Sequence, residues 1–314
     1  MQRLLRIYLF APLIVVFCAC VLAGPQANAA PRLRYPSKGF FLLESGKDGE
    51  FYIDLPPLEL EDAIIKKFKW DLREKGLEHR ATVGEADIPH FLKTGKRAQA
   101  LTGRGIQELT IKKVEVSSEY TSAGLIVTFN ERLITERVLD FTDGWRGIVA
   151  FDWVFPPRAR LRKIRDPDSS PSIPRRQVKS IFESVTSGLA PSDRAKAMKI
   201  GMGSEQLRFV KGDFFGLGGS LIWLSTPEES GGSTMTFAGV VDAKGKLVRT
   251  LVPVHIGAGE RVQTLWPDFA VDIDGDGVEG AIVTEGFYES EYVNLYESDG
   301  EEVVKITVRA QEIE

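Results

Sequence analysis

One short segment of the chain has the residue pattern of a metal-binding loop. It runs Asp272-Ile273-Asp274-Gly275-Asp276-Gly277-Val278, with aspartates at its first, third and fifth positions. Alternate carboxylates can converge on one hard cation, and the glycines let the backbone curl tightly around it. Ca²⁺ accepts about six to eight oxygen ligands, so the pattern predicts one calcium site. Its expected ligands are the carboxylates of Asp272, Asp274 and Asp276 and the carbonyl oxygen of Val278.

The same loop has a simpler interpretation, an acidic hairpin turn that holds no metal. Two observations also separate it from the EF-hand. Its twelfth position is Val283, where an EF-hand carries a bidentate glutamate. The following segment, Gly286–Tyr296, alternates like a strand instead of beginning a helix. The loop is therefore expected to join two strands.

Around this loop the chain resembles the FG-GAP/VCBS-type repeats of integrin-like β-propellers. The resemblance rests on an apolar triplet on each side of the loop and on an aromatic-rich strand that ends in a glycine turn. These segments are Phe269-Ala270-Val271, Ala281-Ile282-Val283, and Val293-Asn294-Leu295-Tyr296 with Asp299-Gly300. The resemblance implies a calcium loop between two strands of a propeller blade, with the same aspartates and the Val278 carbonyl as ligands.

The family usually has a further acid at the ninth loop position, and this chain departs from that pattern. Gly280 occupies the ninth position, and Glu279 stands one residue earlier. The resemblance therefore adds Glu279 to the candidate ligands. The displaced acid predicts weak binding, in the range of about 10⁻⁴–10⁻³ M that is common for extracellular calcium modules.

The acidic loop lies in the second of two similar units. Leu207–Trp223 and Pro267–Val283 each contain an apolar strand, a loop with glycine and aspartate, and a second apolar strand. A shift of about 60 residues superposes the two second strands, which is typical of β repeats. We expect repeat units at about 207–248 and 267–305. The first unit keeps only Asp213 of the aspartates, so a metal ion is expected only in the second.

The chain as a whole is predicted to be mainly β, with β-propeller-like or stacked antiparallel units in its C-terminal half. In Leu58–Lys75, apolar residues recur every four positions, which predicts one amphipathic helix in an α+β N-terminal domain. Glu108–Val116 predicts a strand with one irregularity. The expected divisions are a signal peptide (1–29), the N-terminal domain (30–157), a basic, Pro- and Ser-rich linker (158–177) and a nearly all-β domain (178–314).

The N-terminus predicts export from the cytoplasm, into the periplasm or the medium. Arg3 and Arg6 precede an apolar run, and Ala27 and Ala29 form a signal-peptidase site that predicts cleavage after Ala29. Both cysteines of the chain precede this site, so the mature protein is expected to contain no thiol and no cysteine metal site. Its three histidines are far apart in sequence, which argues against a histidine-built site.

The charge gives no reason to expect nucleic acid or an anionic membrane as a partner. Lys and Arg number 40 against 44 Asp and Glu, a net charge of −4, and signal removal takes away two of the basic residues. No stable membrane insertion is expected after cleavage. The partner remains open between a protein and a carbohydrate. Tyr288, Tyr292 and Tyr296 share one face of a strand and either stack such a ligand or pack inside the fold.

Two functions of different class follow from these observations. The first is an exported, non-catalytic calcium-binding β-repeat protein with a binding or structural role. The second is an extracytoplasmic hydrolase that uses paired carboxylates on a β scaffold, because acidic residues are plentiful. The sequence contains no G-x-S-x-G elbow, no P-loop and no H-E-x-x-H motif. The calcium-binding protein is the leading hypothesis.

Overall fold

The computed structural model divides the chain into two compact units, Met1–Ser37 and Lys38–Glu314, and everything below concerns the second. The described residues are 40–45, 50–54, 79–82, 90–119, 122–134, 145–151, 154–164, 175–203, 207–226, 235–257, 264–287, 290–298 and 302–312. The predicted signal peptide and the predicted helix Leu58–Lys75 lie outside these residues.

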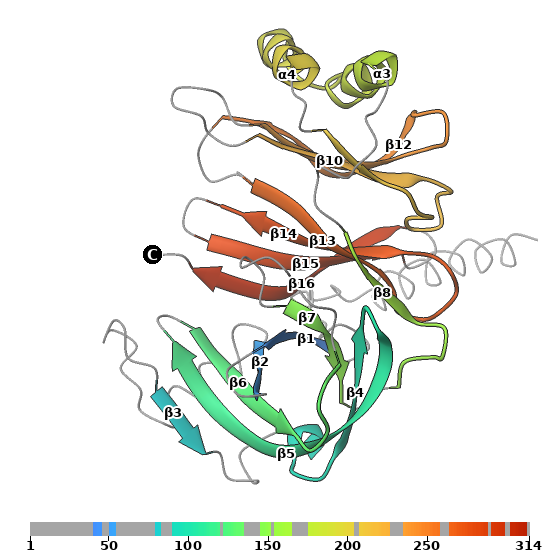
Figure 1. Cartoon of the computed structure of the whole chain (residues 1–314). Helices are drawn as coiled ribbons and strands as arrows, with labels where there is room; N and C mark the ends of the chain where they lie inside the picture. The colour runs from blue at the N-terminus through green and yellow to red at the C-terminus, as the bar shows by residue number, and fades with distance from the viewer. Residues whose placement is uncertain are drawn as a thin grey trace, which may run out of the picture. The chain divides into compact units, whose positions relative to one another are not determined.

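Seven strands near the N-terminus form a sheet that almost closes on itself (Figure 1). They are β1 (Phe40–Ser45), β2 (Glu50–Asp54), β3 (His79–Thr82), β4 (Arg97–Thr102), β5 (Gly105–Glu119), β6 (Ser122–Phe129) and β7 (Trp145–Ala150), with the short 3₁₀ helix η2 (His90–Leu92). Their order is β3-β5-β4-β7-β1-β2-β6, and β5 also pairs with β6. Because the long strand β5 pairs with β4 and also with β6, the strands from β5 through β4, β7, β1, β2 and β6 return to β5 as in a barrel.

The predicted strand at Glu108–Val116 is confirmed as part of β5, and its irregularity is a register shift between Ile111 and Lys113. Along each strand, successive side chains point to opposite faces of the barrel sheet. In β1, Phe41 and Leu43 contribute to the interior core, whereas Leu42 points to the opposite face. The barrel sheet is thus apolar inside and, over β1, β4 and β7, also apolar outside.

Five antiparallel strands cover this outer face. They are β8 (Arg160–Lys163), β13 (Thr264–Asp272), β14 (Gly280–Gly286), β15 (Ser290–Ser298) and β16 (Val303–Glu312), in the order β16-β15-β14-β13-β8. The segment 160–163 was expected in a linker, and the structure instead places it at the edge of this sheet. Leu161 is buried and Arg160 and Arg162 are exposed, so the segment has the alternation of an edge strand despite its charge.

A four-stranded sheet and two helices complete the part of the fold that the structure describes. The elements are β9 (Arg208–Val210), β10 (Ser220–Thr226), β11 (Met235–Val241), β12 (Leu247–Ile256), α3 (Arg175–Val185) and α4 (Pro191–Gly203). The expectation of an almost all-β chain from Val178 onward is wrong for residues up to 203. Val178, Ile181, Phe182 and Val185 recur at helical spacing, and this stripe packs against the four-stranded sheet.

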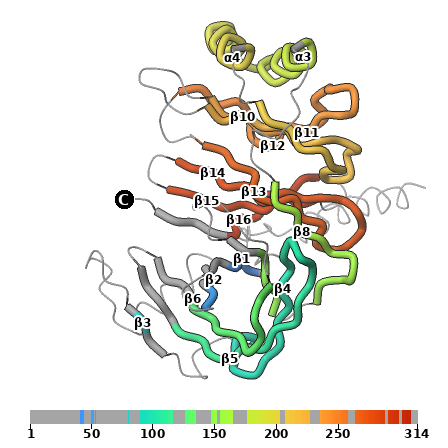
Figure 2. The backbone as a smooth tube through the Cα atoms, in the orientation of Figure 1, coloured from blue at the N-terminus to red at the C-terminus, as the bar shows by residue number. Residues whose placement is uncertain are grey.

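Three apolar cores join the layers in a fixed order. One lies between the barrel and the five-stranded sheet, a second between the two open sheets, and a third between the four-stranded sheet and the helices. The path of the chain through β9–β12 and then β13–β16 is that of two antiparallel meanders, which Figure 2 traces. The prediction of a mainly β protein with stacked antiparallel units is confirmed.

The core between the barrel and the five-stranded sheet should be essential for stability. Ile148 is completely buried there, so Ile148→Ala should lower the free energy of unfolding by about 2–5 kcal/mol through lost burial and a residual cavity. Ile134, whose surface is 63% exposed, supplies the matched control, and Ile134→Ala should change stability by no more than about 0.5 kcal/mol. Urea denaturation measures both, and equal losses for the two variants would contradict the layered core.

Candidate metal centre

The acidic loop, residues 272–279, joins the ends of two buried strands. β13 ends at Asp272, β14 begins at Gly280, and Val271 pairs with Gly280 at the base of the loop. Ile273 is buried in the core beneath the barrel sheet, whereas Asp274 and Asp276 are exposed. Ile273 and Asp272 are thus both buried, and the two later aspartates face the solvent.

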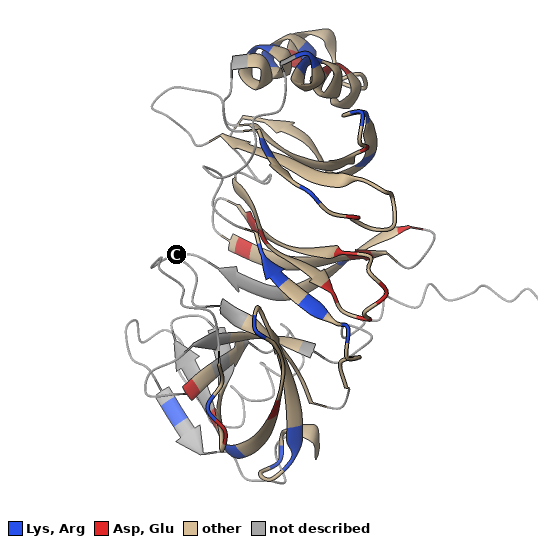
Figure 3. Cartoon of the chain, turned by 45° about the vertical axis from the view of Figure 1, so that its right-hand side comes forward, with Lys and Arg blue, Asp and Glu red and all other residues tan. Residues whose placement is uncertain are grey.

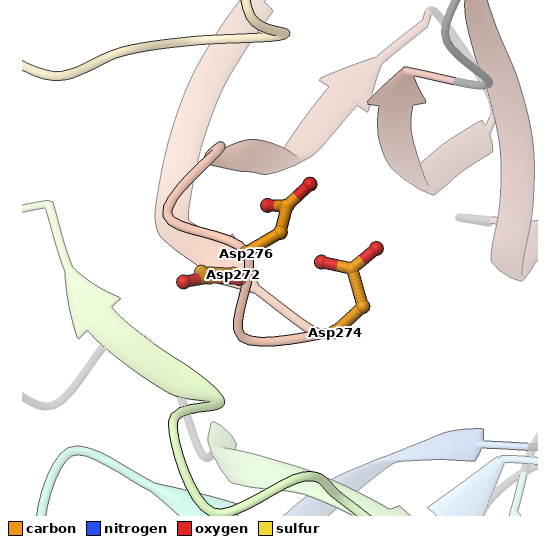
Figure 4. Close-up of side chains that lie close together, drawn as sticks. All are labelled: Asp272, Asp274 and Asp276. Atoms are coloured by element: carbon orange, nitrogen blue, oxygen red, sulfur yellow. The ribbon is translucent and has the colours of Figure 1, made fainter.

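Three carboxylates meet at this loop (Figure 4). One oxygen from each of Asp272, Asp274 and Asp276 lies within 4.8 Å of the others. Ca²⁺–oxygen distances of about 2.3–2.6 Å place two ligands on opposite sides of an ion about 5 Å apart. The cluster can therefore hold one metal ion. Within the residues that the structure describes, it is the one group of three or more potential metal-ligating side chains.

Backbone hydrogen bonds hold the loop in shape. The amides of Gly275 and Gly277 donate to the two carboxylate oxygens of Asp272, at 2.7 and 3.1 Å, and the amide of Val278 donates to Asp276 at 2.7 Å. Both glycines have positive φ angles, 72° and 93°, which side chains other than glycine rarely adopt. Each carboxylate oxygen has two lone pairs, so these bonds leave acceptor capacity for a cation.

The surroundings of Asp272 disfavour its charge. Asp272 is only 6% exposed, and desolvation is the largest influence on its pKa, which is raised above the usual aspartate value. The two glycine amides oppose this shift, and the negative charges of Asp276 and Asp274 add to it. A cation at the cluster would relieve both the repulsion and the cost of burying the charge.

Glu279 does not join the aspartates. Its carboxylate forms a two-pronged ion pair with Arg162 of β8, with Nη2 at 2.8 and 2.7 Å from the two oxygens and Nε at 3.1 Å from one of them. Figure 3 shows the basic residues of β8 in blue beside the acidic residues of the loop in red. Of the five candidate ligands, the structure therefore brings together the three aspartate carboxylates and directs Glu279 elsewhere.

A second loop, residues 213–219, shares part of this backbone design but keeps only the first of the aspartates, and we call it the apolar loop. Asp213 accepts a hydrogen bond at 2.8 Å from the amide five residues later, as Asp272 does from Gly277. Gly216 and Gly218 have positive φ angles like those of the two glycines of the acidic loop. The shared pattern is aspartate, a buried apolar residue, any residue, glycine, any residue, glycine, and it was visible in the sequence as Asp213-Phe214-Phe215-Gly216-Leu217-Gly218.

The two loops are hydrogen-bonded to each other. The amide of Glu279 donates to the carbonyl of Asp213, and the amide of Phe215 donates to the carbonyl of Glu279, both at 2.9 Å. Phe214 and Glu279 thereby form an isolated parallel bridge between the two C-terminal sheets. Sequence analysis found neither this bridge nor Arg162, because the partners are far apart along the chain.

The tyrosines of β15 have a packing role where the structure describes them. Tyr296 is buried between the two open sheets, and its hydroxyl donates to the buried carboxylate of Glu285. Glu285 also accepts a hydrogen bond from Lys305 at 2.7 Å. Burial is the main cause that raises the pKa of Tyr296. Tyr292 contacts Phe287 edge-on, and Tyr288 lies outside the described residues.

Comparisons with protein-family models, curated proteins and solved structures give no match to this chain. Within the described residues, no helix has the length and apolar content needed to cross a membrane.

The two glycines of the acidic loop should differ in their tolerance of a side chain. Alanine at either position must adopt a positive φ angle, at a cost of about 1–2 kcal/mol. A methyl group at Gly275 would also lie 2.9 Å from the Cβ of Arg158, whereas none of the atoms around Gly277 would come within 4 Å. Thermal unfolding in the presence of a chelator should therefore show a larger loss for Gly275→Ala than for Gly277→Ala. The reverse order would contradict the observed packing of the loop.

Proposed function

We propose that this chain is a non-catalytic calcium-binding β protein in which the ion has a structural role. Asp272, Asp274 and Asp276 bind one Ca²⁺ and thereby cross-link the ends of β13 and β14. The observation that carries the proposal is the convergence of three carboxylate oxygens within 4.8 Å at a hairpin loop. Neutralising these charges turns a repulsive cluster into a stabilising one.

The donor set favours calcium over other common ions. All three side chains offer carboxylate oxygens, the ligands that hard cations prefer, whereas zinc and copper sites usually contain nitrogen or sulfur. Mg²⁺ requires a strict octahedron and gives up its waters reluctantly, while Ca²⁺ tolerates irregular geometry. Because Glu279 is engaged with Arg162, water must complete the coordination shell, and we expect weak binding.

The expected location of the protein agrees with a weak calcium site. The N-terminal sequence pattern of a signal peptide supports export, to surroundings where calcium can be abundant. The resemblance of the acidic loop to FG-GAP/VCBS-type repeats supports the same chemistry. We propose on these grounds that the calcium-bound β units serve to display a surface for a protein or carbohydrate partner outside the cytoplasm.

Calcium should raise the melting temperature of the mature protein. At a hundredfold excess over Kd, an ion that binds only the folded state adds about 2.7 kcal/mol of stability. The calcium-induced shift should be lost in Asp274→Asn and kept in Asp193→Asn, a control on the exposed surface of α4. Differential scanning calorimetry in chelator, in millimolar Ca²⁺ and in Mg²⁺ measures the shift, which should be smaller with Mg²⁺. A wild-type melting temperature that is identical in chelator and in excess calcium would refute the proposal.

Acid should weaken calcium binding at a higher pH than ordinary aspartates would require. The raised pKa of Asp272 means that the folded, metal-free protein takes up a proton more readily than the unfolded chain. The metal-free protein therefore gains stability from this group as the pH falls through its folded-state pKa toward the usual value of 3.8, while the proton competes with Ca²⁺.

Calorimetric titration of calcium at a series of pH values tests this competition. The affinity should fall, and proton release on binding should appear, while the pH is still above 3.8, the usual aspartate pKa. The difference between the calcium and chelator melting temperatures should shrink over the same interval. An affinity that stays constant down to 3.8 would show that Asp272 is not a ligand.

A further inference from the structure

Glu279, three residues after the last aspartate of the metal cluster, joins the two C-terminal sheets. Glu279 is one residue beyond Val278, whose amide is bonded to Asp276. Its own amide and carbonyl bond to Asp213 and Phe215 of the apolar loop. The backbone of Glu279 is thus shared between the hairpin that carries the metal cluster and the loop that leads into β10.

The side chain of Glu279 adds a second connection through Arg162. The same guanidinium nitrogen that bonds both carboxylate oxygens also donates to the carbonyl of Lys211, at 3.1 Å. Arg162 belongs to β8 at the edge of the five-stranded sheet, and Lys211 directly follows β9 of the four-stranded sheet. Arg162 therefore connects the two sheets beside the acidic loop, through its ion pair with Glu279 on one side and its hydrogen bond to Lys211 on the other.

The apolar loop depends on these contacts for its conformation. Phe215 has a φ angle of 60°, which is strained for a bulky residue and persists only where the surroundings enforce it. Its ring is buried together with that of Phe214 in the core between the two sheets. The amides of Phe214 and Leu217 bond within the loop, whereas the amide of Phe215 itself donates to the carbonyl of Glu279. A change in the backbone conformation at Glu279 should therefore alter the conformation of the apolar loop.

We propose that metal occupancy of the acidic loop is transmitted through Glu279 and Arg162, so that the cation controls how firmly the four-stranded sheet is held against the five-stranded sheet. This inference rests on the proposed calcium binding. Without a cation, repulsion among the three carboxylates loosens the segment from Asp272 to Val278, and Glu279 moves with it. With the cation bound, the segment is fixed, and both of its connections to the four-stranded sheet are strengthened.

Hydrogen exchange of the full mature chain, with chelator and with saturating Ca²⁺, tests the transmission. Calcium should slow exchange within residues 264–287, which contain the metal loop, and also within residues 207–226 of the neighbouring sheet. The slowing in the second segment should lie in the range of about 5- to 150-fold that is typical of coupled sites. Residues 97–114 of the barrel provide an internal reference and should not change.

Two variants test the transmission independently of metal binding. Arg162→Gln and Glu279→Gln remove the ion pair and leave the three aspartates in place, so calorimetric titration should still detect calcium. The calcium-dependent slowing in residues 207–226 should become smaller in both variants. Arg176→Gln, at an exposed position of α3, is the control and should behave like the wild type.

The possible outcomes distinguish this inference from the proposed function. If wild-type protein does not bind calcium, the proposed function fails and this inference fails with it. If calcium binds but slows exchange only in residues 264–287, the proposed function stands and the transmission is refuted. Undiminished slowing in residues 207–226 of both ion-pair variants would also overturn the inference, since their calcium binding is measured separately.

Discussion

Burial of both faces of the five-stranded sheet is the constraint on which the other layers depend. Phe269 and Val271 of β13 contribute to the core with the barrel, and Ala270 between them contributes to the core with the four-stranded sheet. A slip of one residue would exchange these two faces, so the register of β13 and β14 is strongly specified. That register also fixes the position of the acidic loop, because the last paired residues of the two strands form the base of the loop.

The sequence predicts those parts of the site that depend on local pattern. The spacing of three aspartates and two glycines locates the acidic loop, and apolar strands on both sides of it imply a hairpin. The ion pair of Arg162 and Glu279 could not be predicted, because no local signal relates residues separated by 117 positions. The strand β8 could not be predicted, because three of its four residues are charged and only Leu161 is buried. The helical stripe of α3 was present in the sequence, but a short segment after a proline- and serine-rich stretch was read as part of a β domain.

Comparison of the two loops distinguishes the residues that determine the backbone conformation from those that add negative charge. Both have an aspartate that accepts a backbone amide five residues later, a buried apolar residue beside it, and glycines at positive φ angles. Only the acidic loop has aspartates at its third and fifth positions, where the apolar loop has Phe215 and Leu217. The hydrogen bond five residues on and the glycine turns thus occur in both loops, and the two additional acids are what make a metal cluster of the acidic loop.

The hydrogen bonds within the acidic loop leave the cation a limited but well-placed task. Asp272 is already oriented by two amides, so an ion gains little from ordering it and mainly offsets the repulsion that involves Asp274 and Asp276. Such an ion need not bind tightly. Its position matters more than its affinity, because Glu279, three residues after the cluster, bonds both to the apolar loop and to Arg162. Under the proposed coupling, a small gain in order at the acidic loop therefore acts on hydrogen bonds that join the two C-terminal sheets, and a weak site at that point influences the packing of a whole layer.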